Sequence, residues 1–212
     1  MKKSITAIFA LVTLSATLMA CKNKAKEAET KDAETIAITK IASEKFTVNT
    51  SESTIAWKGF KPTGSHTGTI AIKNGILNII EGEINSGTFL IDMNSIKDAD
   101  ASAKLEGHLK SADFFDVEKY PTATFEITSI KDVDGKTMLS GNLTLKEVKN
   151  NVTFPVSVTN ENNTVTLTSE SFVIDRTKWN VQYGSKSIFD NLGDKFINDD
   201  IELQVTVKAS KS

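Results

Sequence analysis

Apolar and polar positions alternate with a period of two over most of the chain from Phe46 onward. β-Branched and aromatic residues dominate the alternating runs, which is typical of strands in a pleated, half-buried sheet. About nine such strands at hairpin spacing predict an antiparallel barrel or sandwich. The runs are 46–49, 54–57, 67–72, 84–93, 123–130, 138–145, 152–158, 164–174 and 201–207.

Turn signals separate several of these runs. Asn74-Gly75 and Asp134-Gly135 supply the positive φ that tight hairpin turns need, so we expect a hairpin at each. Asn160–Asn163 predicts a further polar turn.

Two intervals depart from the strand pattern. Asp98–Ser111 has good helix formers, an acidic start and Leu105 with Leu109 four residues apart, which predicts a short helix. Gly107 weakens that helix and limits it to about two or three turns. Asn180–Phe196 is a long connection with room for one short helix.

The N-terminus has the features of a bacterial lipoprotein signal. Lys2 and Lys3 precede an apolar run, Ile5–Ala20, and Cys21, the single cysteine, follows a small residue. We expect removal of residues 1–20 and attachment of acyl chains such as palmitate to Cys21. The product would be lipid-anchored in the bacterial cell envelope, on the periplasmic face of the outer membrane or on the cell surface. The alternative is that the apolar run stays as a transmembrane anchor.

Residues 22–45 mix Lys, Glu and Ala and contain no aromatic residue. Such a segment buries too little apolar surface to offset its ordering entropy, so we expect a flexible tether of roughly 25–30 Å. The predicted division is therefore a signal peptide (1–20), a lipidated cysteine with its tether (21–45) and one β-barrel domain (46–212).

Charge and composition exclude several functions. Loss of Lys2 and Lys3 lowers the basic count from 25 to 23 against 27 acidic residues, a net charge of −4, so nucleic acid is not an expected partner. A lipidated Cys21 forms no disulfide. A zinc site would need both His66 and His108 with carboxylates, and we predict no metal.

Motifs of catalysis do not occur in the sequence. It has no nucleophile elbow, no HExxH and no Gly-rich phosphate loop, and we predict a protein that is not an enzyme. The acidic positions Asp190, Asp194, Asp199 and Asp200 lack the spacing of a calcium loop.

The segment 107–126, GHLKSADFFDVEKYPTATFE, closely resembles the signature of the YceI-like family, with its H-L-x-S-x-D-F-F-D…Y-P-x-A-x-F core. Three further pieces agree in order, at 141–155, 172–179 and 201–205, so the resemblance covers nearly all of residues 46–210. Glu147 departs from it, because many members have glycine in a tight turn there.

The resemblance implies a mainly all-β, lipocalin-like, extended eight-stranded antiparallel β-barrel with one or two short helices. It also implies a long amphiphilic ligand in the barrel: a polyisoprenoid, an isoprenoid quinone or a fatty-acyl derivative. No other cofactor is expected, and the function would be sequestration or transport. The rival interpretations are a packed barrel acting as a protein-interaction or envelope-stress module and, more remotely, an enzyme that uses His66 and His108. The oligomeric state, a homodimer included, stays open.

The candidate ligand-binding residues are large apolar side chains on the predicted strands, together with polar residues beside them. For each apolar residue the competing interpretation is a packed core, because alternation does not say which barrel face a strand shows. For His108, the alternative to binding a ligand head group is a hydrogen bond to a strand or to Asp113. For Arg176, the alternative to binding a head group is a structural ion pair with Asp175. The candidates are Trp57, Phe60, His66, Phe89, Ile91, Phe125, Phe172, Ile174, Arg176, Trp179 and Tyr183.

Overall fold

A computed structural model describes residues 25–36 and 42–212 of the 212-residue chain. The predicted signal peptide and Cys21 lie outside these residues. Within the described ranges, no helix has the length and apolar character needed to cross a membrane.

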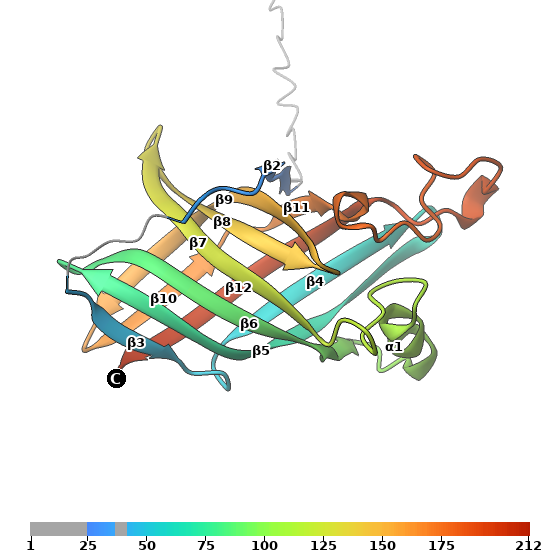
Figure 1. Cartoon of the computed structure of the whole chain (residues 1–212). Helices are drawn as coiled ribbons and strands as arrows, with labels where there is room; N and C mark the ends of the chain where they lie inside the picture. Colours follow the sequence, from blue (N-terminus) through green and yellow to red (C-terminus); the bar gives the residue numbers. More distant parts are fainter. Residues whose placement is uncertain (1–24, 37–41) are drawn as a thin grey trace, which may run out of the picture.

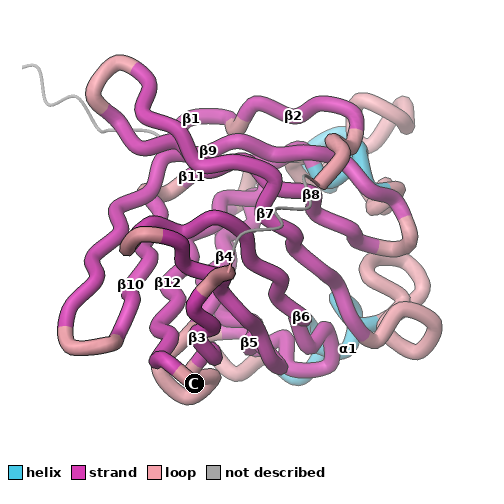
Figure 2. Tube along the Cα trace, turned by 60° about the vertical axis from the view of Figure 1, so that its left-hand side comes forward, coloured by secondary structure: helices cyan, strands magenta, loops and turns pink. Residues whose placement is uncertain are grey.

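The described strands form one ring-like sheet (Figures 1 and 2). The N-terminal segment contributes β1 (Lys26–Glu27) and β2 (Glu29–Asp32). The other strands are β3 (Glu44–Val48), β4 (Thr54–Lys61), β5 (Gly64–Ile80), β6 (Glu83–Asp98), β7 (Thr122–Val133), β8 (Lys136–Leu145), β9 (Val148–Glu161), β10 (Thr164–Ser169), β11 (Phe172–Asp175) and β12 (Asp200–Lys211).

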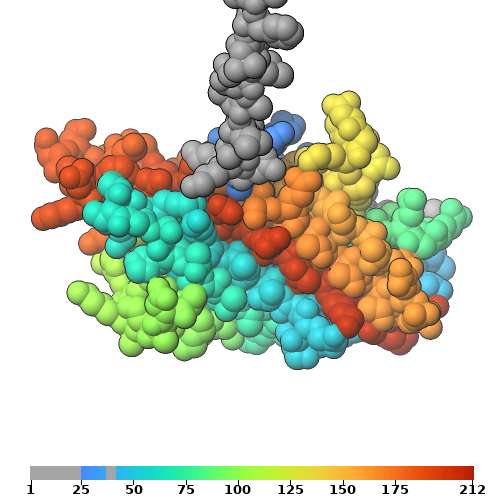
Figure 3. Space-filling model, turned by 180° about the vertical axis from the view of Figure 1, so that it is seen from behind, coloured from blue at the N-terminus to red at the C-terminus, as the bar shows by residue number. Residues whose placement is uncertain are grey.

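The pairing closes the sheet into an eight-position antiparallel barrel. β5 through β10 pair antiparallel in chain order, with a helix in the connection between β6 and β7. β12 pairs with β10 and β11 on one side and with β3 and β4 on the other. β3 and β4 pair with β5 one after the other and so fill a single position in the wall. β10 and β11 pair one after the other with β12 and fill another position. Figure 3 shows β12 running diagonally between these two positions. The predicted lipocalin-like barrel is confirmed.

One helix, α1 (Ala103–Lys110), lies beside the barrel end where the 180–199 connection also lies (Figure 1). Ser102 caps it by accepting a hydrogen bond from the Leu105 backbone N–H (3.3 Å). The helix falls inside the interval predicted from sequence. The 3₁₀ turns η1 (Arg176–Trp179) and η2 (Gly193–Lys195) are the remaining helical elements of the described chain.

One predicted turn is correct and another is wrong. Asp134-Gly135 joins β7 to β8, with φ of 50° and 77°. Asn74-Gly75 instead lies inside β5, beside a register shift, and the hairpin forms at Glu81-Gly82. A Cβ on Gly75 would lie 2.8 Å from both Phe89 and Val48 side-chain atoms, so this glycine serves close packing rather than a turn.

The turn between β8 and β9 is built without glycine. Lys146 and Glu147 both have positive φ, 49° and 64°, a conformation that costs energy for residues with a Cβ. The Lys146 ammonium donates to the carbonyls of Phe114 (2.8 Å) and Asn180 (3.3 Å), and these contacts offset part of that cost. The turn that the YceI-like pattern predicts is therefore kept despite Glu147.

Residues 26–32 are not part of a free tether, which corrects the expectation drawn from their composition. β1 pairs in parallel with β11 and β2 pairs antiparallel with the first half of β9. Ala28 between them is 5% exposed, and its N–H donates to the Val173 carbonyl (2.8 Å). β10 pairs only with the second half of β9, so this segment takes up backbone groups that β10 leaves unpaired. Composition did not predict that this segment is ordered, because the pairing of its backbone does not depend on apolar side chains.

Polar side chains hold the continuation of this segment on the outer wall. The amide of Asn142 accepts a hydrogen bond from the Glu34 N–H (2.9 Å) and donates to the Glu34 carbonyl (2.7 Å). Asn151 donates to Asn142 (3.1 Å), and Thr128 donates to the Glu34 carboxylate (2.9 Å). Asn142 and Asn151 are each only 1% exposed, which is tolerated because these groups are paired. We call residues 26–34 the seam segment.

Candidate functional site

The half of the barrel next to α1 encloses an apolar cavity of about 210 Å³. The opposite half is filled by side chains at most 2% exposed that do not line the cavity; they include Phe46, Leu77, Ile79, Ile127 and Val165. The lumen is thus packed at one end and hollow at the other.

Nine of the eleven predicted ligand-binding residues line this cavity. They are Trp57, Phe60, His66, Phe89, Ile91, Phe125, Phe172, Ile174 and Arg176. Strand alternation brings them together, because in β6, for example, Phe89, Ile91 and Met93 are buried while Leu90 and Asp92 are half-buried on the other face.

Trp179 and Tyr183 do not line the cavity. The Trp179 side chain is fully buried, and its Nε1–H donates to the Leu143 carbonyl (3.0 Å), so it anchors η1 to the wall. Tyr183 is 44% exposed and packs edge-on against His108, with ring centroids 4.8 Å apart. Both were candidate ligand-binding residues, and the structure places both outside the cavity lining.

Much of the lining comes from strands whose inward face the sequence did not identify. Phe154 of β9 stacks on Phe172 with centroids 4.0 Å apart. The alternation in these strands was visible, but their register relative to the lumen was not. The additional wall residues are Leu139, Leu143, Leu145, Val152, Leu167, Leu203, Val205 and Val207.

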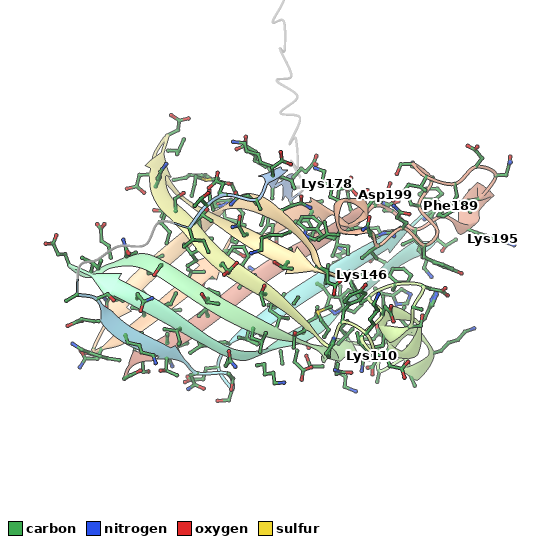
Figure 4. The ribbon with its side chains drawn as sticks, viewed as in Figure 1. Lys110, Lys146, Lys178, Phe189, Lys195 and Asp199 are labelled. Atoms are coloured by element: carbon green, nitrogen blue, oxygen red, sulfur yellow. The ribbon has the colours of Figure 1, made fainter. Side chains whose placement is uncertain are left out.

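The cavity reaches the barrel end formed by α1, the β4–β5 hairpin and the start of β12. Leu105, His108 and Leu109 contribute from the helix, and Phe114 and Phe115 from the segment that follows it. Lys61, Asn198 and Asp200 line the cavity from the neighbouring hairpin and connection. We call this end the mouth. Figure 4 shows Lys146, Asp199 and Phe189 at the same end.

Arg176 lies at the mouth, where it binds backbone carbonyls of the 180–199 connection. Its guanidinium donates to the carbonyls of Asn198 (3.0 Å), Val181 (2.5 Å) and Ile197 (3.1 Å). Its carboxylate neighbour is Asp199, with Nη2 and Oδ1 3.6 Å apart, whereas Asp175 accepts instead from the Thr177 N–H (2.9 Å). Burial lowers the pKa of Arg176, and the carboxylates of Asp199 and Asp175 oppose that shift.

These contacts give Arg176 a structural role, because it ties both ends of the 180–199 connection to the barrel. The expected ion pair with Asp175 is replaced by one with Asp199. The guanidinium also lies 5.5 Å from the centre of the Phe114 ring, which fixes Phe114 at the mouth.

His108 and His66 have different environments. His108 Nε2 lies 3.3 Å from the Asp113 carboxylate, the structural partner that the sequence suggested. His66 Nδ1 lies 3.7 Å from Asp98 Oδ1, and both atoms are buried without a hydrogen-bond partner in the described part of the chain. The Trp57 Nε1–H donor is likewise buried without a hydrogen-bond partner among the described residues. Unpaired buried polar atoms mark a place where a bound group can be recognised.

The cavity volume limits what fits. An apolar cavity of about 150 Å³ accommodates benzene, so by proportion about 210 Å³ holds roughly eight carbon atoms. A longer chain therefore leaves part of its length at the mouth, or the wall side chains rotate to admit it.

Comparisons with known proteins agree with this architecture. The family model described as the YceI-like domain matches residues 46–209. BcnA of Burkholderia cenocepacia is similar in structure, with a TM-score of 0.63 and 23% identity over 77% of this chain and 99% of that one. A polyisoprenoid-binding domain from Saccharophagus degradans, implicated in plant cell wall breakdown, has a TM-score of 0.59 and 13% identity over 79% and 98% of the two chains.

The Campylobacter jejuni YceI protein is also similar, with a TM-score of 0.50 and 17% identity over 96% of this chain and 99% of that one. At these identities the solved structures show the fold. No curated protein matches the sequence. The seam segment lies before the matched range, so the family model does not account for it.

Proposed function

The chain belongs to the YceI-like family, and from this premise and the hollow half of its barrel we propose that it binds a long amphiphilic lipid. The ligand class is a polyisoprenoid, an isoprenoid quinone or a fatty-acyl derivative. The role is sequestration or carriage near a membrane, a matter of binding rather than chemistry. The polyisoprenoid-binding domain of Saccharophagus degradans has the same fold and supports this choice.

The observation that carries the proposal is the apolar cavity with an open, partly polar mouth. Its walls are Leu, Ile, Val and Phe from every wall position of the barrel. Burial of a methylene is worth about 0.8 kcal/mol, so roughly eight buried carbons contribute about 6 kcal/mol. A chain of this kind gains affinity without any specific hydrogen bond.

The polar end of the ligand belongs at the mouth. Lys61, His66, Asn198 and Asp200 all line the cavity there. Arg176 is also present, but three backbone carbonyls occupy its donors, so it shapes the mouth more than it holds an anion. A head group of modest polarity, such as a hydroxyl, a quinone carbonyl or a carboxyl, suits this set better than a diphosphate.

We further propose that acyl chains on Cys21 anchor the barrel to the envelope membrane. Because β1 starts at Lys26, only residues 22–25 separate the cysteine from the barrel wall. Five residue steps reach at most about 18 Å, less than the 25–30 Å expected for a free tether. The wall formed by β9, β11 and the seam segment would therefore lie close to the membrane that supplies the ligand.

Mass spectrometry of organic extracts from natively purified protein tests the ligand. We expect an isoprenoid or acyl lipid in about stoichiometric amount, and recovery of binding when delipidated protein receives a prenyl alcohol or quinone. Repeated absence of any co-purifying amphiphile, together with no binding of added lipids, would refute the proposal.

Metabolic labelling with palmitate tests the anchor separately. The wild-type chain should take up label and fractionate with membranes, and Cys21→Ser should do neither. Labelling that persists in Cys21→Ser would contradict lipidation at this residue, whatever the barrel binds.

A further inference from the structure

Three side chains at the mouth form a group that lipid binding does not require as a unit, although one of them, His66, also lines the lipid cavity. His66 comes from the start of β5, Asp98 from the end of β6, and Asp100 from the turn before α1. Each offers one ligand atom, and these atoms all lie within 4.8 Å of one another. The strand pairing brings them together, because Gly68, two residues after His66, pairs directly with Asp98.

Two atoms of this group, one from His66 and one from Asp98, are unpaired. His66 Nδ1 and Asp98 Oδ1 are buried, have no hydrogen-bond partner within the described ranges, and lie 3.7 Å apart. That distance is too long for a hydrogen bond. Two ligand atoms held about 2.0–2.2 Å from one ion at a tetrahedral angle lie roughly 3.4 Å apart, so the spacing is close to that of a shared metal ion.

The surroundings hold Asp98 in place. Its side chain is fully buried, and Oδ2 accepts a hydrogen bond from the Ser102 N–H (3.1 Å). Its own backbone N–H donates to Glu106 Oε1 (3.1 Å). One carboxylate oxygen is therefore fixed by the helix cap while the other stays available, as is usual for a ligand oriented by outer-shell hydrogen bonds.

We propose that His66, Asp98 and Asp100 bind a divalent transition-metal ion of the zinc type. One imidazole nitrogen and two carboxylate oxygens suit Zn²⁺, whereas Mg²⁺ prefers oxygen ligands alone. The two carboxylates balance the charge of the ion. The nearby Lys97 ammonium pairs with Glu106 at 3.0 Å and is not the counter-ion of this group.

Three protein ligands leave one position for water or for a polar group of a bound molecule. His66 lines the lipid cavity, so the ion would lie at its mouth. The inference goes beyond the proposed function, because the metal site does not require a lipid to be present.

Isothermal titration of ZnCl₂ into EDTA-treated full-length protein tests the site, with MgCl₂ as the comparison ion. All samples carry Cys21→Ser so that a free thiol does not bind zinc. The informative variants are His66→Gln and Asp100→Asn, both at positions accessible enough to change without loss of the fold. Asp113→Asn is the matched control, because Asp113 is an exposed aspartate beside the other histidine.

We expect one equivalent of Zn²⁺ in the wild type and in Asp113→Asn, and little response to Mg²⁺. Each site variant should weaken zinc binding at least about 10-fold, since loss of an outer-shell partner alone costs 10–100-fold. Absence of zinc binding by the wild type, or equal binding by all variants, overturns the proposal and leaves His66 and Asp98 as an ion pair. Equal weakening by Asp113→Asn overturns it in favour of His108. None of these outcomes depends on lipid extraction.

Discussion

Filling the cavity from Gly59 is the most direct test of the hollow lumen. Gly59 lines the cavity and pairs with His66 on one side and Ile201 on the other. A Cβ built there meets nothing within 4 Å, and the backbone is not in the left-handed region. Gly59→Leu therefore adds an apolar side chain at the cavity wall, and its Cβ enters open space.

The size of the effect follows from the volume. At about 25 Å³ per carbon, the four carbons of leucine occupy about 100 Å³, roughly half of the cavity. A ligand that loses four buried methylene equivalents loses about 3 kcal/mol, so its dissociation constant should rise roughly 100-fold. The free energy of unfolding should stay equal or increase, because the side chain fills a void rather than displacing atoms.

Titration with a fluorescent fatty-acid analogue measures this change, and urea unfolding checks the fold. Gly107→Leu is the matched control, because Gly107 is exposed on α1 and a Cβ there also meets nothing within 4 Å. Binding by Gly59→Leu that equals the wild type would refute binding in this cavity. Equal loss in Gly107→Leu would show that the effect is not one of volume.

Three further predictions concern stability. Ala28→Asp buries an unpaired carboxylate under the seam segment and should cost about 1–3 kcal/mol in urea unfolding, whereas Ala33→Asp, at an exposed position of the same stretch, should cost nothing measurable; equal effects would contradict docking of the segment. Arg176→Met leaves three carbonyls without their donor, so it should lower the free energy of unfolding by about 3 kcal/mol or more and speed proteolysis of the 180–199 connection, with Arg176→Lys intermediate. A stable, protease-resistant Arg176→Met would contradict the role of Arg176 in tying this connection to the barrel. A hydrogen bond from Lys97 lowers the pKa of Glu106 below its usual 4.5, so ionised Glu106 stabilises the wild type above pH 4.5 and this contribution should be lost as the pH falls below that value. The melting temperature of Glu106→Gln should therefore fall less on acidification, and identical pH profiles of the two proteins would count against this pairing.

The architecture was largely readable from the sequence. Period-two alternation from Phe46 onward located the strand runs, and the cluster from Gly107 to Glu126 identified the family and with it the eight-position barrel. Helix formers between Asp98 and Ser111 located α1. These features are local, since each depends on side chains a few residues apart.

Tertiary structure alone decided what depends on register and on distant backbone. Asn74-Gly75 has the composition of a turn, yet close packing against Phe89 places it inside a strand. Residues 26–32 have the composition of a tether, yet the free edges of β9 and β11 pair with their backbone. Trp179 and Tyr183 resemble ligand contacts in sequence but lie outside the lumen.

The same division applies to the candidate sites. The sequence by itself determined that the strands have one apolar face and that only two histidines are available. It required both for a metal site, whereas the fold sets His66 beside Asp98 and Asp100 and leaves His108 with Asp113. Which residues meet across a barrel depends on strand stagger and closure, and these are set by the packing of the whole ring. Composition and residue spacing therefore do not predict that geometry.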